Sequence, residues 1–388
     1  MDATMRWLGV VLVGLGMYAS SAAAYDAKLK VLIVDGRNNH DWKTTTPVLD
    51  EMLEATGRFA VTVHTAPPKV DGKADAFPVR LTTRDLQPYG CILSNYNGPR
   101  WAPETEEAVE AFVAGGKGLA VVHAANNCHG AWQAYQQMLG YNWRGSGHGP
   151  KFEYDVHITD PEHPITKGVP DFWHNKDELY HLLKLNPAAT HLRVLATSFS
   201  PPRMIRLKRT RKDGTKYVKD HCFGTGNDEP VVVVTDYGDG RCFHMILGHY
   251  DSSMTDNGFK TLMTRGVEWA ATGKVTLPVM EPVPAAKDMR RYPEPQVVVE
   301  GLEQHLIRKE YDRLPGLFAR DGQAMAKFAE ANAPEILRMI RTLRIGKVKW
   351  HIAGDMARWT IPDHPAHEPF RQICCVKQGR EWRIDGIQ

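Results

Sequence analysis

Three histidines of this sequence follow directly after short apolar runs. His40 lies in the segment after the run at residues 30–34, His123 is the first residue after the run at 118–122, and His249 comes just after a later run. Imidazole titrates near neutral pH and also binds metal ions, so these groups suit proton transfer or metal binding. Each histidine alone is more commonly structural. Their shared position at strand ends groups them into one candidate site.

Further polar and aromatic residues occupy the same kind of position. Trp42 and Asn97 follow the first and third predicted strands, and His148 lies in a Gly-rich stretch that could carry it over a pocket or form an ordinary surface turn. Together with His40, these are the expected substrate-binding residues. Four tryptophans near the strand ends could form a platform for a sugar ring or simply pack in the core. They are Trp42, Trp101, Trp132 and Trp143.

An acidic pair, Asp177-Glu178, lies in the long middle segment. It could supply a general base, and Glu178 is the carboxylate that we assign to the site, although a solvated helix start is the simpler interpretation of the pair alone.

No cofactor is identified by a strong motif. One divalent metal ion could be held by His40, His123 and His249. The sequence contains no HExxH and no CxxC pair, so the spacing of the residues does not show whether a metal ion is bound. The Gly-rich residues 144–149 precede a strand instead of opening a helix after one. No nucleotide is therefore expected.

The elements that must position these residues follow an α/β pattern. In an open parallel sheet, the loops at the carboxyl ends of the strands meet at one edge, so we expect the three histidines to meet there. Two predicted hairpins, at 203–219 and 231–247, should extend the sheet with antiparallel strands. The predicted strands are 30–34, 59–64, 91–94 and 118–122, and the predicted helices are 44–56, 103–114 and 257–271.

The chain is predicted to contain two domains. Residues 28–278 form a doubly wound, mainly parallel α/β domain, and 279–295 form a Pro-rich linker. Residues 296–388 show helical spacing over 297–318 and 333–343, then strands and turns, and are predicted as a smaller α+β domain.

Composition and the first residues limit the class of protein further. The net charge of +3 over 388 residues argues against a dedicated nucleic-acid binder. Residues 1–24 contain one arginine, an apolar stretch and small residues up to Ala24, a pattern typical of a cleaved secretory signal. We therefore predict a periplasmic or secreted protein with no membrane attachment after cleavage. Its six cysteines show no regular spacing, and they could pair or pack as buried thiols.

Several segments between residues 28 and 278 together resemble the ThuA-like (trehalose-utilisation) family. The resemblance implies a class I glutamine-amidotransferase-like fold and an association with carbohydrate metabolism. That fold class usually has a cysteine nucleophile on the turn after a central strand, but here His123 stands on that turn and Cys128 is five residues further on. Glutamine hydrolysis through a thioester is not expected. The segments are VLIVDGRNNHDWKTTTPVL, GKGLAVVHAANN, DPEHPITKGVPDFW, DELYHLL, VVVVTDYGDGRCFHMILGHY and GVEWAATGKV.

The C-terminal residues resemble the cone-shaped domains of the SnoaL or nuclear-transport-factor-like type. The resemblance rests on EGLEQHLIRKEYDRLPGLF and the terminal GREWRIDGI. It implies a domain that encloses a pocket or forms dimers, so we expect that the protein could assemble into a homo-oligomer through this domain.

Together these features predict an exported enzyme acting on a sugar or an oxidised (keto) sugar by hydrolysis or lyase-type cleavage. His123 and His249 would transfer protons or hold a metal, and Glu178 would be the auxiliary carboxylate. A keto group beside the glycosidic carbon acidifies a ring proton, so a modest base suffices. The alternative from another class is a non-catalytic carbohydrate-binding or scaffold protein.

Overall fold

The computed structural model describes residues 27–68, 76–144, 146–210, 214–287, 295–345, 349–361, 370–378 and 381–388. The predicted signal segment, residues 1–24, lies outside the described residues. Within them, no helix combines the length and the apolar character needed to cross a bilayer.

One half of the large sheet is parallel, as predicted. The continuous apolar runs of the sequence become its central strands, which are buried on both faces. In space the order runs β2-β1-β3-β4-β15, with every neighbouring pair parallel. These strands are β1 (Leu29–Asp35), β2 (Phe59–Thr65), β3 (Cys91–Ser94), β4 (Gly118–Val122) and β15 (Gly240–Met245).

The other half of the sheet is antiparallel and continues the order as β15-β14-β11-β7-β8. The sequence predicted β14 but left the segment between residues 150 and 200 unassigned. The last strand, β8, contacts the short helix that follows β15. This antiparallel half comprises β7 (Phe152–Ile158), β8 (Phe172–Asp177), β11 (Thr190–Phe199) and β14 (Asp228–Tyr237).

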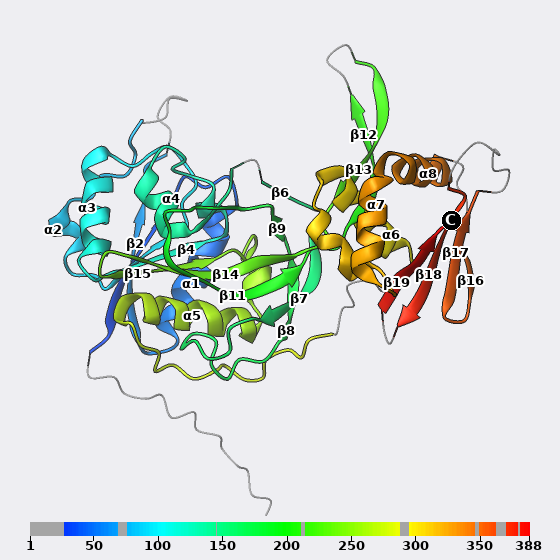
Figure 1. Cartoon of the computed structure of the whole chain (residues 1–388). Helices are drawn as coiled ribbons and strands as arrows, with labels where there is room; N and C mark the ends of the chain where they lie inside the picture. The colour runs from blue at the N-terminus through cyan, green and yellow to red at the C-terminus, as the bar shows by residue number, and fades with distance from the viewer. Residues whose placement is uncertain are drawn as a thin grey trace, which may run out of the picture.

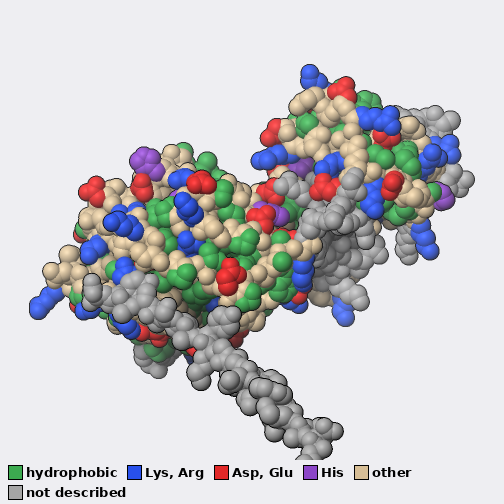
Figure 2. Space-filling model, turned by 90° about the horizontal axis from the view of Figure 1, so that it is seen from below, with side chains coloured by type: hydrophobic (Ala, Val, Ile, Leu, Met, Phe, Trp, Pro, Cys, Tyr) green, Lys and Arg blue, Asp and Glu red, His purple; other side chains and the backbone are tan. Residues whose placement is uncertain are grey.

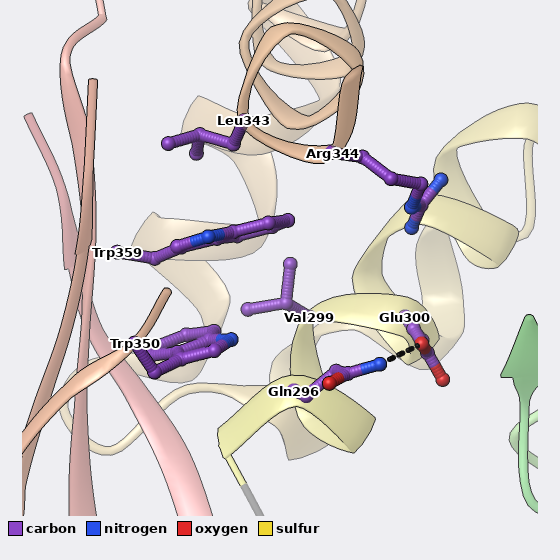
Figure 3. Close-up of a pocket in the computed structure, with 7 residues that line it drawn as sticks. All are labelled: Gln296, Val299, Glu300, Leu343, Arg344, Trp350 and Trp359. Atoms are coloured by element: carbon purple, nitrogen blue, oxygen red, sulfur yellow. Dashed lines mark hydrogen bonds between the residues drawn. The ribbon is translucent and has the colours of Figure 1, made fainter. Parts of the chain in front are cut away.

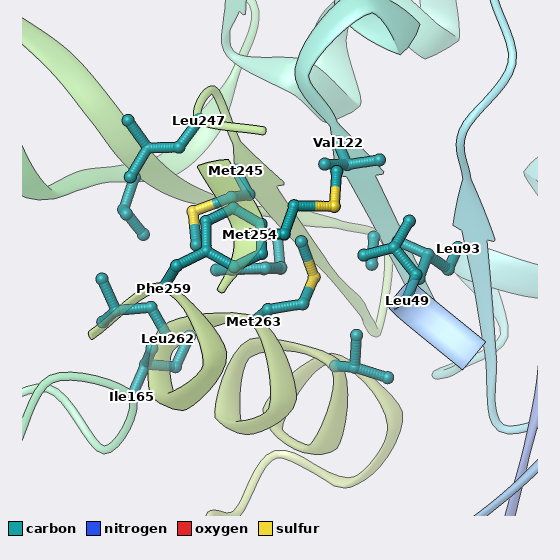
Figure 4. Packing of buried hydrophobic residues seen from close by; sticks show 14 of the residues in the cluster. Leu49, Leu93, Val122, Ile165, Met245, Leu247, Met254, Phe259, Leu262 and Met263 are labelled. Carbon is teal, nitrogen blue, oxygen red and sulfur yellow. The ribbon is translucent and has the colours of Figure 1, made fainter. Parts of the chain in front are cut away.

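Helices cover the sheet on both faces (Figure 1). On one face, α5 packs Phe259, Leu262 and Met263 against Val122 and Met245 of the strands (Figure 4). The close approach of this helix needs Gly266, because a Cβ there would collide with the Phe243 ring. The principal helices are α1 (Trp42–Glu54), α3 (Pro103–Ala114), α4 (Gln133–Leu139) and α5 (Asn257–Thr272).

Short elements complete the large domain around the ends of its strands. The pair β6 and β9 is antiparallel, as is the pair β5 and β10. They are α2 (Thr83–Leu86), η1 (His123–Asn126), β5 (Tyr141–Asn142), β6 (Gly147–His148), β9 (Tyr180–His181), β10 (Lys184–Leu185) and η2 (Asp251–Met254).

The first predicted hairpin forms but does not extend the large sheet. β12 (Arg203–Thr210) and β13 (Lys216–Phe223) pair only with each other among the described strands and project from the body of the molecule (Figure 1). The expectation was wrong for this hairpin because its basic run, residues 208–216, cannot be buried on both faces of a central strand. The second hairpin, β14 and β15, lies in the large sheet as expected.

The C-terminal domain places helices against a four-stranded antiparallel sheet in the order β16-β17-β18-β19. The helix predicted over 297–318 stops at Arg308 and a 3-10 helix containing Pro315 follows, while α7 was not predicted. The elements are α6 (Pro295–Arg308), η3 (Tyr311–Leu317), α7 (Gly322–Ala331), α8 (Ala333–Ile345), β16 (His351–Ala353), β17 (Met356–Thr360), β18 (Gln372–Gln378) and β19 (Glu381–Ile387).

The described part of the predicted linker is packed rather than free. Val279 and Val283 are partly buried and pack against the core of the large domain. The two domains also touch, since Phe199 of the large domain belongs to the hydrophobic cluster of the C-terminal one.

Acidic and basic side chains are interspersed over the face shown in Figure 2.

Candidate functional site

Three histidines and one carboxylate form a cluster at the ends of the strands. His40 lies between β1 and α1, His123 follows β4, His249 follows β15, and Glu178 follows β8. Each residue offers one donor atom, and the four atoms all lie within 4.8 Å of one another. Residues more than two hundred positions apart in the sequence therefore share one site, at the edge where the sequence predicted that the histidines would meet.

His123 is the first residue of η1, at the sharp turn that follows β4. Its φ of 43° lies in the left-handed region, which a residue with a Cβ rarely adopts. Its Nδ1 lies 2.7 Å from the carbonyl oxygen of Ile246. A carbonyl only accepts, so Nδ1 carries a proton. The other ring nitrogen, Nε2, points into the cluster and lies 3.2 Å from Nδ1 of His249.

Glu178 is the anionic centre of the cluster. One of its oxygens, Oε2, lies 2.9 Å from Nδ1 of His249 and 3.7 Å from Nε2 of His123, and the other, Oε1, lies 3.4 Å from Nδ1 of His148. Burial by itself raises the pKa of Glu178, but hydrogen bonds and charge from His123 and His249 outweigh it and hold the pKa well below the ordinary value. The carboxyl group is therefore an anion.

The interpretation of Asp177-Glu178 as a solvated helix start was wrong. Both side chains are buried, and Asp177 is the last residue of strand β8. Its carboxylate accepts backbone N–H bonds from Gly248 at 2.7 Å, from Glu178 at 2.8 Å and from His249 at 3.0 Å. It thereby fixes the backbone of two residues that face the cluster.

His174 forms a second buried layer behind the cluster. Its Nε2 lies 3.0 Å from Asp177 and its Nδ1 lies 2.9 Å from Asp256, the residue that caps α5. Burial alone lowers the pKa of His174, but the hydrogen bonds and charges of the two aspartates outweigh it and raise the pKa to about 9. A charged imidazolium therefore joins β8 to α5.

His40, in the loop between β1 and α1, completes the cluster. Its ring centre lies 4.1 Å from that of His249 and 5.0 Å from that of His123. Burial, together with the neighbouring imidazoles, lowers the pKa of His40 to about 3, so the ring is neutral. Its buried Nδ1 has no hydrogen-bond partner among the described residues. An unpaired buried nitrogen of this kind is available to bind a ligand.

Three side chains that the sequence did not single out lie around the cluster. The ammonium of Lys151 lies 3.8 Å from Oε1 of Glu178, hydrogen-bonds to the hydroxyl of Tyr250 and lies 4.1 Å from the centre of its ring. Tyr250 directly follows His249, so its place in the same loop could have identified it from the sequence as a residue near the cluster. Tyr180, in β9, packs its ring 4.3 Å from that of His123.

The other predicted substrate-binding residues have different surroundings. His148 is exposed, and its Nδ1 lies 3.4 Å from Oε1 of Glu178. Trp42 begins α1, and its backbone N–H donates to the carbonyl of His40 at 2.8 Å. Asn97 donates to the side chain of Asn39, next to His40.

Of the two alternatives for the tryptophans, a sugar platform or core packing, two of the four residues take core packing. Trp101 and Trp132 are buried in the core beneath α3 and α4, whereas Trp143 packs 4.5 Å from the Tyr180 ring near the cluster. Burial of their large apolar surface accounts for the core positions of Trp101 and Trp132.

Cys128 is unsuited to nucleophilic chemistry. It is buried, its thiol donates to the carbonyl of Ala125 at 3.1 Å, and burial raises its pKa well above the ordinary value. A thiol held in its protonated form is a poor nucleophile. Cys91, Cys128, Cys242, Cys374 and Cys375 are all free and buried.

The four donor atoms fit a divalent transition metal. Three imidazole nitrogens and one carboxylate oxygen are a common ligand set for zinc, iron or manganese. The bond from His123 to Ile246 supplies the outer partner that usually orients a histidine ligand.

The mixed α/β fold, with a large central sheet, fits the ThuA or glutamine-amidotransferase-like fold, and His123 stands at the turn after β4. The chain belongs to the ThuA family, whose model, described as trehalose utilisation, matches residues 30–270. The C-terminal domain lies outside that match.

The solved structures that are similar to this chain include two ThuA-like proteins. A ThuA-like protein of Parabacteroides merdae is 30% identical with a TM-score of 0.56, over 67% of this chain and 96% of that one. A ThuA-like protein of Bacteroides uniformis is 20% identical with a TM-score of 0.46, over 65% and 95%. No curated protein matches.

Proposed function

We propose that the large domain is a metal-dependent enzyme that acts on a sugar or a keto sugar by hydrolysis or lyase-type cleavage. The observation that carries this proposal is the cluster of His40, His123, Glu178 and His249, whose donor atoms lie within 4.8 Å of one another. The description of the family as trehalose utilisation supports a carbohydrate substrate.

The cluster would hold one divalent cation through its three imidazoles and its carboxylate. A bound cation would polarise a carbonyl or hydroxyl oxygen of the sugar. The chain itself prepares the ligands: Ile246 fixes the tautomer of His123, and Asp177 fixes the backbone of Glu178 and His249.

The residues beside Glu178 would bind the substrate and move protons. Lys151 and Tyr250 share a hydrogen bond beside Glu178, and His148 faces the same carboxylate from β6. All three carry N–H or O–H groups that can donate to sugar oxygens. With a keto sugar, an imidazole in its neutral form would take the acidified ring proton on its free nitrogen, which requires no cysteine.

The experiment compares metal content and turnover in the full-length protein. We expect about one divalent ion per chain by elemental mass spectrometry and product formation from trehalose or from oxidised disaccharides. His123→Ala should lose both the ion and turnover while its circular dichroism spectrum stays unchanged. His157→Ala, whose partly exposed ring pairs with Asp171, is the matched control and should behave as wild type.

Two results would contradict the proposal. Wild-type turnover in His123→Ala would remove that residue from the site. Sugar binding without product after long incubation, in metal-loaded protein, would instead favour the carbohydrate-binding or scaffold protein.

We also propose that the protein is exported, on the pattern of residues 1–24. Mass spectrometry of the mature protein should find a new N-terminus after Ala24 in the periplasmic or extracellular fraction. An intact N-terminus in the cytoplasmic fraction would exclude export.

A further inference from the structure

The C-terminal domain contains a cavity of about 200 Å³ that is separate from the histidine cluster. It lies between α6, the end of α8 and the segment that carries Trp350 and Trp359 (Figure 3). Pockets for drug-sized ligands measure roughly 300–1,000 Å³, so this cavity suits a ligand of about one ring. Its lining residues are Gln296, Val299, Glu300, Leu343, Arg344, Trp350 and Trp359.

One wall of the cavity is aromatic and apolar. The indole rings of Trp350 and Trp359 are stacked, with centres 5.4 Å apart and planes inclined by 16°. Val299 and Leu343, both fully buried, continue the apolar lining. Tryptophan walls of this kind pack well against the carbon skeleton of a ring.

The facing wall is polar and carries both donors and acceptors (Figure 3). Gln296 donates to Glu300 at 2.8 Å, and both lie on the cavity face of α6. The guanidinium of Arg344 is held by Glu303 through two bonds of 2.9 and 2.7 Å. The carboxylate of Glu300 is buried although it borders the cavity.

This mixture of groups discriminates between classes of ligand. A cation would meet the guanidinium of Arg344, and an anion would meet the carboxylate of Glu300. A wholly apolar ligand would remove water from three polar side chains and return no hydrogen bond. A neutral ring bearing several hydroxyls donates to the carboxylate, accepts from the guanidinium and packs its carbon skeleton on the indoles.

We propose that this cavity is a second binding site, for a neutral polyhydroxylated ring the size of one monosaccharide unit. The site is independent of the histidine cluster, so it stands even if the large domain performs another reaction. It would tether the protein to a sugar-containing ligand while the large domain acts.

The test is a titration of D-glucose into full-length Glu178→Gln protein, in which the histidine cluster is impaired. Ligand-observed NMR and tryptophan fluorescence should show saturable binding with a Kd of about 1 mM, typical of so few atoms. Trp350→Ala and Glu300→Gln should each weaken binding about tenfold. Ile352→Ala, an exposed change in the same domain, is the matched control and should bind as the parent does.

Three outcomes would overturn the proposal. They are an absence of saturable D-glucose binding, unchanged affinity in the two pocket variants, and preferential binding of choline or benzoate, which probe for a cation and an aromatic anion. Circular dichroism checks that each variant is folded. Should Trp350→Ala fail this check, Gln296→Leu at the exposed start of α6 replaces it, with the same expected loss.

Discussion

At the scale of single residues, Asp177 acts on the cluster through the backbone. Its carboxylate accepts N–H bonds from the backbone of Gly248, Glu178 and His249. The substitution Asp177→Asn replaces one of the accepting oxygens by an NH2 group, which cannot accept a hydrogen bond from these backbone N–H groups. We expect metal affinity to fall about 10- to 100-fold, as for other residues that orient ligands. Competition with a chromogenic chelator measures this affinity.

Asp171→Asn is the control for this change of charge. Asp171 is an exposed aspartate that pairs with His157 at 3.1 Å, and its substitution should leave metal affinity unchanged. Equal affinity in Asp177→Asn and wild type would show that Asp177 supports the fold without orienting the ligands.

The residues of the site were predictable where they follow parallel strands. His123 comes directly after β4 and His249 a few residues after the neighbouring strand β15, so the general rule for strand ends located them. The burial of Glu178 was not predictable in the same way, because it follows the antiparallel strand β8. Lys151 carries no motif, and only the folded chain places it beside Glu178.

At the scale of elements, His174 joins β8 to the start of α5. Its pKa is raised from an ordinary 6.5 to about 9, so its pairing with Asp177 and Asp256 stabilises the fold fully below pH 6.5. This contribution, about 3 kcal/mol, is lost as the pH rises through 9. Urea unfolding of chelator-treated protein at pH 6.5 and 9.5 measures it.

The variant His174→Gln isolates this contribution from other titrating groups. It should be less stable than wild type at pH 6.5 and should lose less stability between the two pH values. His157→Gln, at an exposed ion pair, should keep the wild-type difference. An equal pH dependence in His174→Gln and wild type would mean that His174 is not charged in the folded protein.

The contact between α5 and the sheet depends on a glycine, Gly266, which has no side chain. A Cβ at position 266 would collide with the ring of Phe243, which is fully buried and has no room to move. Gly266→Ala should therefore lower the free energy of unfolding by about 1–3 kcal/mol. Chemical denaturation measures the loss. Gly316→Ala, where a Cβ would meet nothing within 4 Å, should change stability by less than ~0.5 kcal/mol.

The sequence predicted elements best where their apolar pattern is unbroken. The observed bounds of β3, α3 and β4 are those predicted, because continuous apolar runs and a proline at a helix start are strong local signals. The helix α7 was missed because Ala-rich Gly322–Ala331 has few large apolar residues to define a face. The two-residue strands around the site arise from tertiary pairing, which no local pattern encodes.

At the scale of the whole molecule, the two domains have separate hydrophobic cores. The core of the C-terminal domain includes Phe199 of the large domain, and Arg308 donates to the carbonyl of Gly224 at 3.3 Å across the contact. With separate cores, we expect calorimetry to resolve two unfolding transitions.

Metal removal should act on only one of these transitions. A ligand that binds the folded state at a hundred times its Kd stabilises it by about 2.7 kcal/mol, which corresponds to a Tm shift of roughly 5–10 °C for a domain of this size. Chelation should therefore lower the Tm of the large domain and leave that of the C-terminal domain unchanged, and His123→Ala should reproduce the chelated profile without chelator. A single transition whose Tm falls as a whole on chelation would show that the contact through Phe199 couples the two cores. If chelation of metal-loaded protein changed neither Tm, the histidine cluster would not be the metal site.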